Sequence, residues 1–392
     1  MRTFRRLIFW THLIIGVAAG IVVFIMSATG VLLTYEKQIV AWADTSGYDA
    51  GPPAPEAARL PIETLVAKVR AERPDLTIGT ITVKADATAP VSVAAGREDT
   101  VFVNAYTGAV LGSGSPGVRS FFRSVTDWHR WLAMAGDNRT TGRAITGASN
   151  LGFLFLVISG PYLWWPKSWS WTKFRSITWF RRRLPGKARD FNWHNTIGFW
   201  SCLPLVVIVA SGVVMSYPWA NALVYRAVGE EPPVQGRGPG GEARRESSGG
   251  ISGVGLNAIW ARAEQFDRNW RTISLRLPNQ ATQPFTLTVD AGDAGQPQYR
   301  TQLTLDGRTG EVVRTEGYAG YTRGRQWRTF LRFAHTGEFY GIVGQTIAGL
   351  VTLGSTVLVY TGFALSLRRL VRWWRAPKAM PVPAQTPALR TE

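Results

Sequence analysis

Four long stretches without a charged side chain divide the chain into apolar and polar parts. They are Leu7–Tyr35, Ala144–Pro166, Phe191–Tyr225 and Phe339–Leu367, and they run for 29, 23, 35 and 29 residues without Lys, Arg, Asp or Glu. About 20 consecutive apolar residues are enough to cross the hydrocarbon core of a bilayer. A helix in a soluble core is rarely so long and so apolar on all sides. The pattern predicts an α-helical membrane protein with four transmembrane helices.

Two polar insertions separate these stretches, and both change in the same way from helical to strand-like periodicity. Each closes on the pattern Asn/Asp-x-x-Thr-Gly-x-Val, which is typical of a hairpin with glycine in the left-handed conformation. Each insertion is therefore expected to form a small α+β module. The expected elements are 62–71, 77–83, 91–95 and 101–110 in the first insertion, and 255–265, 272–277, 284–289 and 303–312 in the second.

The first and third apolar stretches share a motif. Both read H-x3-G-x13-G-V, beginning at His12 and at His194. Residues four apart lie on one helix face, so Gly16 and Gly198 remove side-chain bulk beside each histidine, where a flat macrocycle can approach the backbone. A glycine face for helix packing is the alternative. Together with the two similar insertions, the motif predicts a duplicated arrangement of span, module, histidine-bearing stretch and span.

Basic residues are concentrated in three short segments. The N-terminal tail, the loop between the second and third apolar stretches and the C-terminal tail hold 17 Lys or Arg against two acidic residues, which is +15 of the net charge of +18. The positive-inside rule then places both termini and this loop on the cytoplasmic side of the membrane. The excess of basic residues is explained by their role in setting membrane orientation and by contacts with anionic lipid headgroups. We therefore expect no nucleic-acid partner. No small-residue cleavage site follows the first span, which is expected to remain as an anchor.

These patterns divide the chain into nine segments. The two insertions become modules on the side opposite the cytoplasm, and the spans and the basic segments take the remaining positions. The predicted division is a cytoplasmic tail and first span (1–35), a first module (36–120), a histidine-bearing segment (121–143), a second span (144–166), a basic loop (167–190), a third span (191–225), a second module with a Gly-rich linker (226–326), a histidine-bearing segment with the fourth span (327–367), and a cytoplasmic tail (368–392).

The four histidines of the chain all lie near the ends of the predicted spans. His12 and His194 are one to two helical turns inside the cytoplasmic face at about 1.5 Å per residue, whereas His129 and His335 precede the outward ends of the second and fourth spans. Two neutral imidazoles from two helices are a common way to hold haem b in a helical bundle. We therefore expect two haem b groups, with axial iron ligands His12 and His194 in one and His129 and His335 in the other.

Other roles for the histidines find less support. A proton relay would use intramembrane Asp or Glu, which the spans lack, and a zinc site would use three or four clustered ligands. Asp127 and Glu338 near the outer pair keep an outer metal site open, while the lone Cys202 excludes an intramolecular disulfide. There is no C-x-x-C-H for haem c attachment. The propionates of the outer haem would pair with Arg123, Arg130, Arg328 and Arg332, and those of the inner haem with Arg5 or Arg189.

The order and spacing of these motifs resemble those of PepSY-associated transmembrane proteins over residues 5–375. The resemblance implies that the insertions are PepSY domains and that the chain is similar to inner-membrane siderophore reductases of the ferrioxamine type, which hold two b-type haems. It also implies His12 and His194 on the cytoplasmic-side haem and His129 and His335 on the periplasmic-side haem. It rests on the Thr-Gly-x-Val ends of the modules, His12 with Thr29-Gly30-Val31, Trp128-His129-Arg130-Trp131, Ser159-Gly160 with Trp164-Trp165-Pro166, and His335-Thr336-Gly337.

The resemblance and the histidines together imply a dihaem oxidoreductase that reduces the iron of a ferric siderophore to Fe(II) in the periplasm. No bond-cleaving catalytic residue is needed, because the haems carry the redox chemistry. The donor would be a quinol or a separate reductase, and Trp128, Trp131 and Tyr340 would form a docking platform beside the outer pair. His129 lies 14 residues before Arg143 and would sit on a separate piece that folds back over the bundle. The alternatives are a haem-free membrane sensor or protease regulator, and a haem-bearing anchor of another periplasmic reductase.

Overall fold

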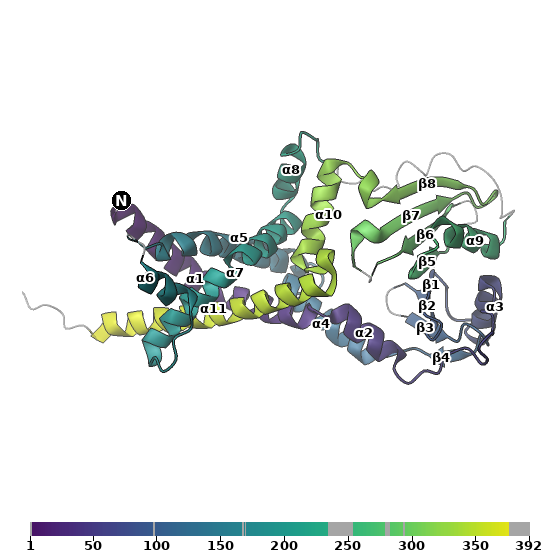
Figure 1. Cartoon of the computed structure of the whole chain (residues 1–392), viewed down its shortest axis with the longest axis horizontal. Coiled ribbons are helices and arrows are strands. Elements are labelled where there is room, and N and C mark those ends of the chain that lie inside the picture. Colours follow the sequence, from purple (N-terminus) through teal and green to yellow (C-terminus); the bar gives the residue numbers. More distant parts are fainter. Residues whose placement is uncertain are drawn as a thin grey trace, which may run out of the picture.

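The computed structural model describes residues 2–96, 99–166, 168, 170–233, 254–278, 283–292 and 295–375. A bundle of long helices forms one end of the molecule, and a β-sheet with its covering helices forms the other (Figure 1). Most of the expected Gly-rich linker at 235–255 lies outside the described residues, as do Lys167, Trp169 and the tail beyond residue 375.

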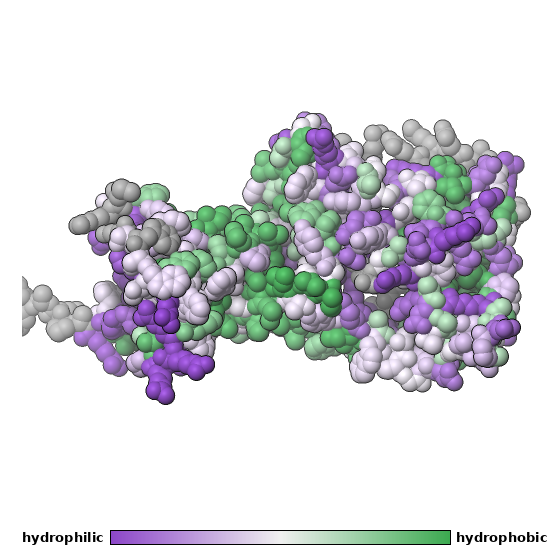
Figure 2. Space-filling view, viewed as in Figure 1, coloured by the Kyte–Doolittle hydropathy of each residue, from purple (hydrophilic) through white to green (hydrophobic). Residues whose placement is uncertain are grey.

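Four long helices make up the bundle: α1 (Arg2–Leu33), α5 (Asn138–Trp164), α7 (Gly186–Ser216) and α11 (Gly341–Arg375). Helices α1 and α7 each pack against both α5 and α11. All four helices are long and apolar enough to cross a membrane, which confirms the prediction of four such spans. Their outward side chains are apolar and exposed, and Figure 2 shows a hydrophobic surface along the middle of the bundle between more polar ends.

The uncharged run from residue 191 to residue 225 contains two helices rather than one. Helix α7 ends at Ser216, and Tyr217 adopts an extended conformation before α8 (Pro218–Arg226) begins. Proline has no N–H and disfavours the helical conformation of the residue before it, so Pro218 ends one helix and occupies the first turn of the next. The membrane-spanning part of this run is therefore shorter than the uncharged stretch.

Shorter helices close the end of the bundle that faces the sheet. Helix α4 (Pro116–Trp131) packs on α1 and α5, and α10 (Arg323–His335) packs on α7 and α8. Helix α4 ends where Leu132 and Ala133 take positive φ angles of 53° and 56°. The chain then turns into α5, where a Cβ atom at Gly142 would overlap the carbonyl oxygen of Trp131. His129 thus lies on a separate helix folded against the bundle, as its spacing predicted.

The two insertions build one sheet, not two separate modules. Its eight strands run antiparallel in the order β4-β3-β2-β1-β5-β6-β7-β8, and the halves join where Ile81 on β1 pairs with Leu275 on β5. Separate modules would each leave a strand edge unpaired, and the β1–β5 pairing removes both of these edges. The strands are β1 (Thr80–Lys84), β2 (Val91–Ala95), β3 (Asp99–Val103), β4 (Val110–Gly112), β5 (Thr272–Arg276), β6 (Phe285–Asp290), β7 (Arg300–Leu305) and β8 (Val312–Gly317).

One face of the sheet carries a shared apolar core. Helices α3 (Ile62–Glu72) and α9 (Leu256–Phe266) cover this face on the side away from the bundle (Figure 1). Val69, Ile81 and Ile259 are fully buried there, in one cluster with residues from both insertions. The sheet is linked to the bundle end through α2 (Glu36–Thr45) and the short 3-10 helix η3 (Glu338–Tyr340), whose Glu338 forms an ion pair with Lys37 at 2.8 Å.

The two predicted hairpins form with glycine in the left-handed conformation. Gly108 and Gly310 have φ angles of 73° and 71°. In each turn the side chain four residues earlier, Asn104 or Asp306, accepts hydrogen bonds from two backbone N–H groups. This local side-chain bonding explains why Asn or Asp and Gly occur together in the motif.

Replacing Gly310 with alanine tests the backbone requirement. A side chain at this left-handed position costs about 1–2 kcal/mol, so we expect Gly310→Ala to speed amide hydrogen exchange in β7 and β8. Gly320→Ala is the control, because Gly320 has ordinary backbone geometry and open space around it. Equal exchange rates in the two variants would contradict this interpretation of the turn.

Candidate functional site

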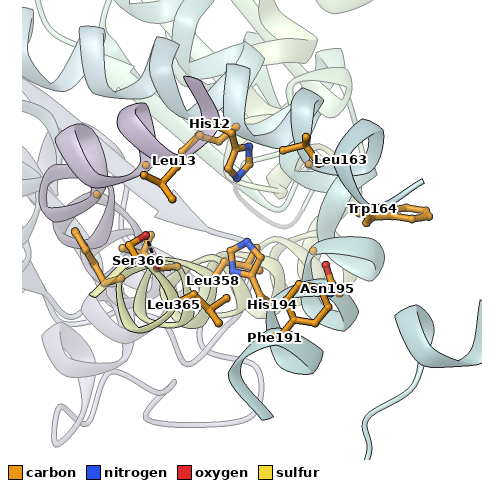
Figure 3. A pocket seen from close by; sticks show the side chains of 18 of the residues that line it. His12, Leu13, Leu163, Trp164, Phe191, His194, Asn195, Leu358, Leu365 and Ser366 are labelled. Carbon is orange, nitrogen blue, oxygen red and sulfur yellow. Dashed lines mark hydrogen bonds between the residues drawn. The ribbon is translucent and has the colours of Figure 1, made fainter. Parts of the chain in front are cut away.

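The four histidines form two pairs, one toward each end of the bundle. His12 on α1 and His194 on α7 line a single cavity of about 940 Å³, and their rings point toward each other across it (Figure 3). His129 on α4 and His335 on α10 lie with ring centroids 6.4 Å apart. The structure therefore brings together the same partners that the sequence paired.

The distance between the pairs follows from helix geometry. On α1, His12 belongs to the first pair, and Thr29, 17 residues later, contacts His129 of the second pair. On α7, His194 and Ser211 have the same separation, and Ser211 contacts His335. At 1.5 Å per residue this is about 25 Å along each helix, close to the hydrocarbon thickness of a bilayer.

Each histidine contacts a hydroxyl group of another helix through its Nδ1 atom. The hydroxyl belongs to Ser or Thr in every case, and the next residue is glycine. The contacts are His12 with Ser159 at 2.7 Å, His194 with Thr361 at 3.0 Å, His129 with Thr29 at 3.0 Å and His335 with Ser211 at 3.1 Å.

The hydroxyl groups determine which ring nitrogen is protonated. A hydroxyl has a single hydrogen, and here it is donated to a carbonyl three or four residues earlier in the same helix, as from Thr361 to Val357 at 2.9 Å and from Ser211 to Ile208 at 2.8 Å. A hydroxyl oxygen that donates in this way accepts from the imidazole, which places the ring proton on Nδ1. At His335 the carbonyl of Ile208, 2.8 Å from Nδ1, also requires a proton on that nitrogen. The Nε2 lone pair is left for a ligand, as in metal-binding histidines whose other nitrogen is fixed by a hydrogen bond.

Burial keeps the outer pair neutral. Burial and the neighbouring His129 lower the pKa of His335 to about 4, and burial also lowers the pKa of His129. A neutral imidazole is the form that binds metals. If two imidazole nitrogens share one metal at about 2.0–2.1 Å each, their ring centres are about 6 Å apart, which matches the observed 6.4 Å. The outer pair thus fits a single metal between two axial rings.

The inner cavity is shaped by glycines. Gly16 and Gly198, one turn beyond the two histidines, both line it, as do Gly160 and Gly362. A Cβ atom at Gly160 would have no neighbour within 4 Å, and at Gly198 the nearest atom would be 3.7 Å away. Gly160 therefore faces open space, whereas a Cβ atom at Gly16 or Gly198 would make ordinary contact with Leu156 or Leu358 of a neighbouring helix. All three line the cavity beside the histidines.

One wall of the inner cavity offers cations and an unused donor. Lys187, Arg369 and Arg372 line it. The indole N–H of Trp164, which also lines it, has no hydrogen-bond partner among the described residues. A buried donor without a partner is costly, so this group fits an acceptor such as a carboxylate. Apolar walls, two facing imidazoles and a cationic side together fit haem.

The two inner arginines expected from the sequence have other contacts. Arg5 donates to the carbonyl of Leu163, and Arg189 pairs with the buried Asp190 at 3.0 Å. Asp190 also lies 2.8 Å from Arg368 of α11. The cavity cations come instead from Lys187 and from the C-terminal helix.

Arginines also gather around the outer pair. Arg130 and Arg139 flank the Trp131 ring, with guanidinium carbons 4.6 and 4.2 Å from its centroid. Burial and repulsion from Arg332 and other arginines lower the pKa of Arg130, which indicates locally concentrated positive charge. Arg328 is held by the side chain of Asn221 at 2.6 Å. The positive charge around Arg130 and Arg332 suits anionic groups, and a propionate role for these two arginines stays a prediction.

The alternative metal site beside the outer pair is not formed. Asp127 pairs with Arg139 at 3.6 Å, and Glu338 pairs with Lys37 at 2.8 Å. Within the described part of the chain, no three His, Cys, Asp or Glu residues are grouped so that they could hold a metal ion. The carboxylates that kept a zinc site open serve as partners of cations.

Some site residues escaped prediction. The Ser/Thr-Gly pairs were visible in the sequence, but only the contacts to Ser159, Thr361, Thr29 and Ser211 reveal their partners. The proposed docking residues Trp128 and Tyr340 are 46% and 65% exposed, whereas Trp131 lies between two arginines.

A family model described as the PepSY-associated TM region matches residues 9–369. A search of curated proteins finds no match.

Proposed function

This chain belongs to the PepSY-associated TM family, and from that premise we propose that it is a dihaem electron-transfer protein of a bacterial inner membrane that reduces ferric siderophore iron. The observation that carries the proposal is the pair of facing histidines at each end of the bundle. Each histidine contacts a hydroxyl group through Nδ1, an arrangement that leaves Nε2 for a ligand. A haem between two such rings is a common arrangement in helical bundles.

The inner haem would be held by His12 and His194. Gly16 and Gly198 leave room for the macrocycle beside the two ligands. Lys187, Arg369 and the free indole N–H of Trp164 would bind its propionates. Apolar side chains make up most of the lining of the same cavity, which suits the apolar faces of a macrocycle.

The outer haem would be held by His129 and His335, with Arg130 and Arg332 toward its propionates. When bound, the two haems supply one-electron transfer across the bundle to a ferric chelate on the side of the sheet. Reduction to Fe(II) weakens the binding of iron to hard oxygen ligands. Exposed Trp128 and Tyr340 offer contact area for the chelate beside this pair.

We infer the orientation from charge. The end of the bundle that carries the N-terminus holds Arg5, Arg6, Lys187, Arg369 and Arg372. The positive-inside rule supports a cytoplasmic position for this end and a periplasmic position for the sheet. Electrons would then come from a quinol or a separate cytoplasmic reductase.

We also infer an internal duplication. Two features support it: the equal separation of histidine and hydroxyl on α1 and α7, and the mirrored strand order on the two sides of β1 and β5. Each half would supply one ligand to each haem. A haem-bearing anchor or a haem-free sensor would use the same fold, and the experiments below separate these functions.

Haem content is the first prediction. Purified protein is expected to show a reduced b-type spectrum with two haems per chain. His12→Ala should lose the inner haem alone, and His129→Ala the outer haem alone, because each removes one ligand of one pair. A colourless wild-type protein would end the haem proposal and favour a binding module.

Filling the inner cavity is the second test. Gly160→Leu places a side chain in open space on the cavity wall without harming the helix, because leucine is a better helix former than glycine. We expect loss of the inner haem and retention of the outer one. Gly117→Leu on α4, also in open space but outside the cavity, is the matched control and should keep both haems. Two haems in Gly160→Leu would contradict the placement.

Reoxidation identifies the acceptor. Protein reduced with dithionite is expected to be reoxidised by ferric hydroxamates, as followed in the haem absorption spectrum. Reoxidation by quinones alone would assign the electron path to another reaction. A stable partner subunit after purification would instead indicate an anchor role.

A further inference from the structure

We propose that Ser159 is the positioning residue of the inner haem, the one hydroxyl that alone sets the tautomer and basicity of its histidine ligand. This rests on the proposed function and adds a role for a residue that does not touch the iron. It follows from a difference among the four histidines, which are alike in their hydroxyl contacts but not in their other partners.

Three of the histidines have a second hydrogen-bond partner on the main chain. His335 lies 2.8 Å from the carbonyl oxygen of Ile208 in addition to Ser211. His129 meets the main chain at Met26, and His194 meets it at Leu358. At His335 this carbonyl can hold the Nδ1 proton without the hydroxyl.

His12 has no such second partner within the described chain. Its Nδ1 contact is the hydroxyl of Ser159 at 2.7 Å, the shortest of the four histidine–hydroxyl contacts. The Ser159 hydroxyl can donate its single hydrogen to the carbonyl of Leu156 at 3.3 Å, and its lone pair then accepts the Nδ1 proton of His12. Ser159 is also only 6% exposed, so bulk water does not compete for this contact.

The consequence is chemical as well as geometric. Without Ser159 the His12 ring can take the other tautomer, in which Nε2 carries the proton and cannot bind iron. A hydrogen bond from Nδ1–H also makes Nε2 more basic, and a more basic ligand favours the ferric state. Loss of such a partner typically costs 10- to 100-fold in metal affinity or activity.

The experiment compares Ser159→Ala with Ser211→Ala in the full chain. Ser211 has the same role toward His335, but His335 keeps the Ile208 carbonyl, so this variant is a matched control. We expect Ser159→Ala to lower the affinity for the inner haem by about 10- to 100-fold in haem titrations, and to raise its midpoint potential. Ser211→Ala should change the outer haem less than threefold.

Two more variants separate the hydroxyl from its volume. Threonine and valine have the same shape, so Ser159→Thr should restore the wild-type potential and Ser159→Val should not. In each variant the retained outer haem reports that the bundle is folded. An inner haem of unchanged affinity and potential in Ser159→Ala, or equal behaviour of the Thr and Val variants, would overturn the inference. A wild-type protein without haem would instead reject the proposed function itself.

Discussion

Hydrogen bonds between histidines and hydroxyl groups of neighbouring helices are the constraint on which the rest of the bundle depends. In lipid there is little hydrophobic drive between helices, so contacts of small and polar residues define how they pack. Here each of α1, α5, α7 and α11 supplies one hydroxyl to a histidine of another helix. The same bonds therefore position the helices and orient the imidazole rings. A change in helix packing would also change the geometry of the histidine ligands.

Much of this architecture could be predicted from the sequence because its signals are local. The length of the uncharged stretches predicts the four long helices, and the Asn/Asp-x-x-Thr-Gly pattern predicts the turns at Gly108 and Gly310. The histidine pairs followed from repeat spacing and from the side of the membrane on which each lies. Pro218 lies within an uncharged run and is therefore counted as part of the third span. It ends α7 because of its backbone chemistry, which is a local signal that hydropathy does not detect.

The remaining features depend on contacts between distant residues. The pairing of β1 with β5 joins residues almost two hundred positions apart, and no pattern within either insertion specifies it. Arginine side chains are long and flexible, so proximity in sequence did not show that Arg189 turns to Asp190 while Arg369 reaches the cavity. The Ser/Thr-Gly pairs had no visible partner until the helices were placed side by side.

The shared sheet has a consequence for how the protein is made. During synthesis the first four strands are translated well before residues 272–276 of β5. The edge of β1 therefore stays unpaired while two more helices insert into the membrane. An unpaired edge is prone to join other chains. The protein therefore passes through a vulnerable interval whose length is set by translation and insertion of α5 and α7, and a binding partner or chaperone that shields β1 would act at that stage.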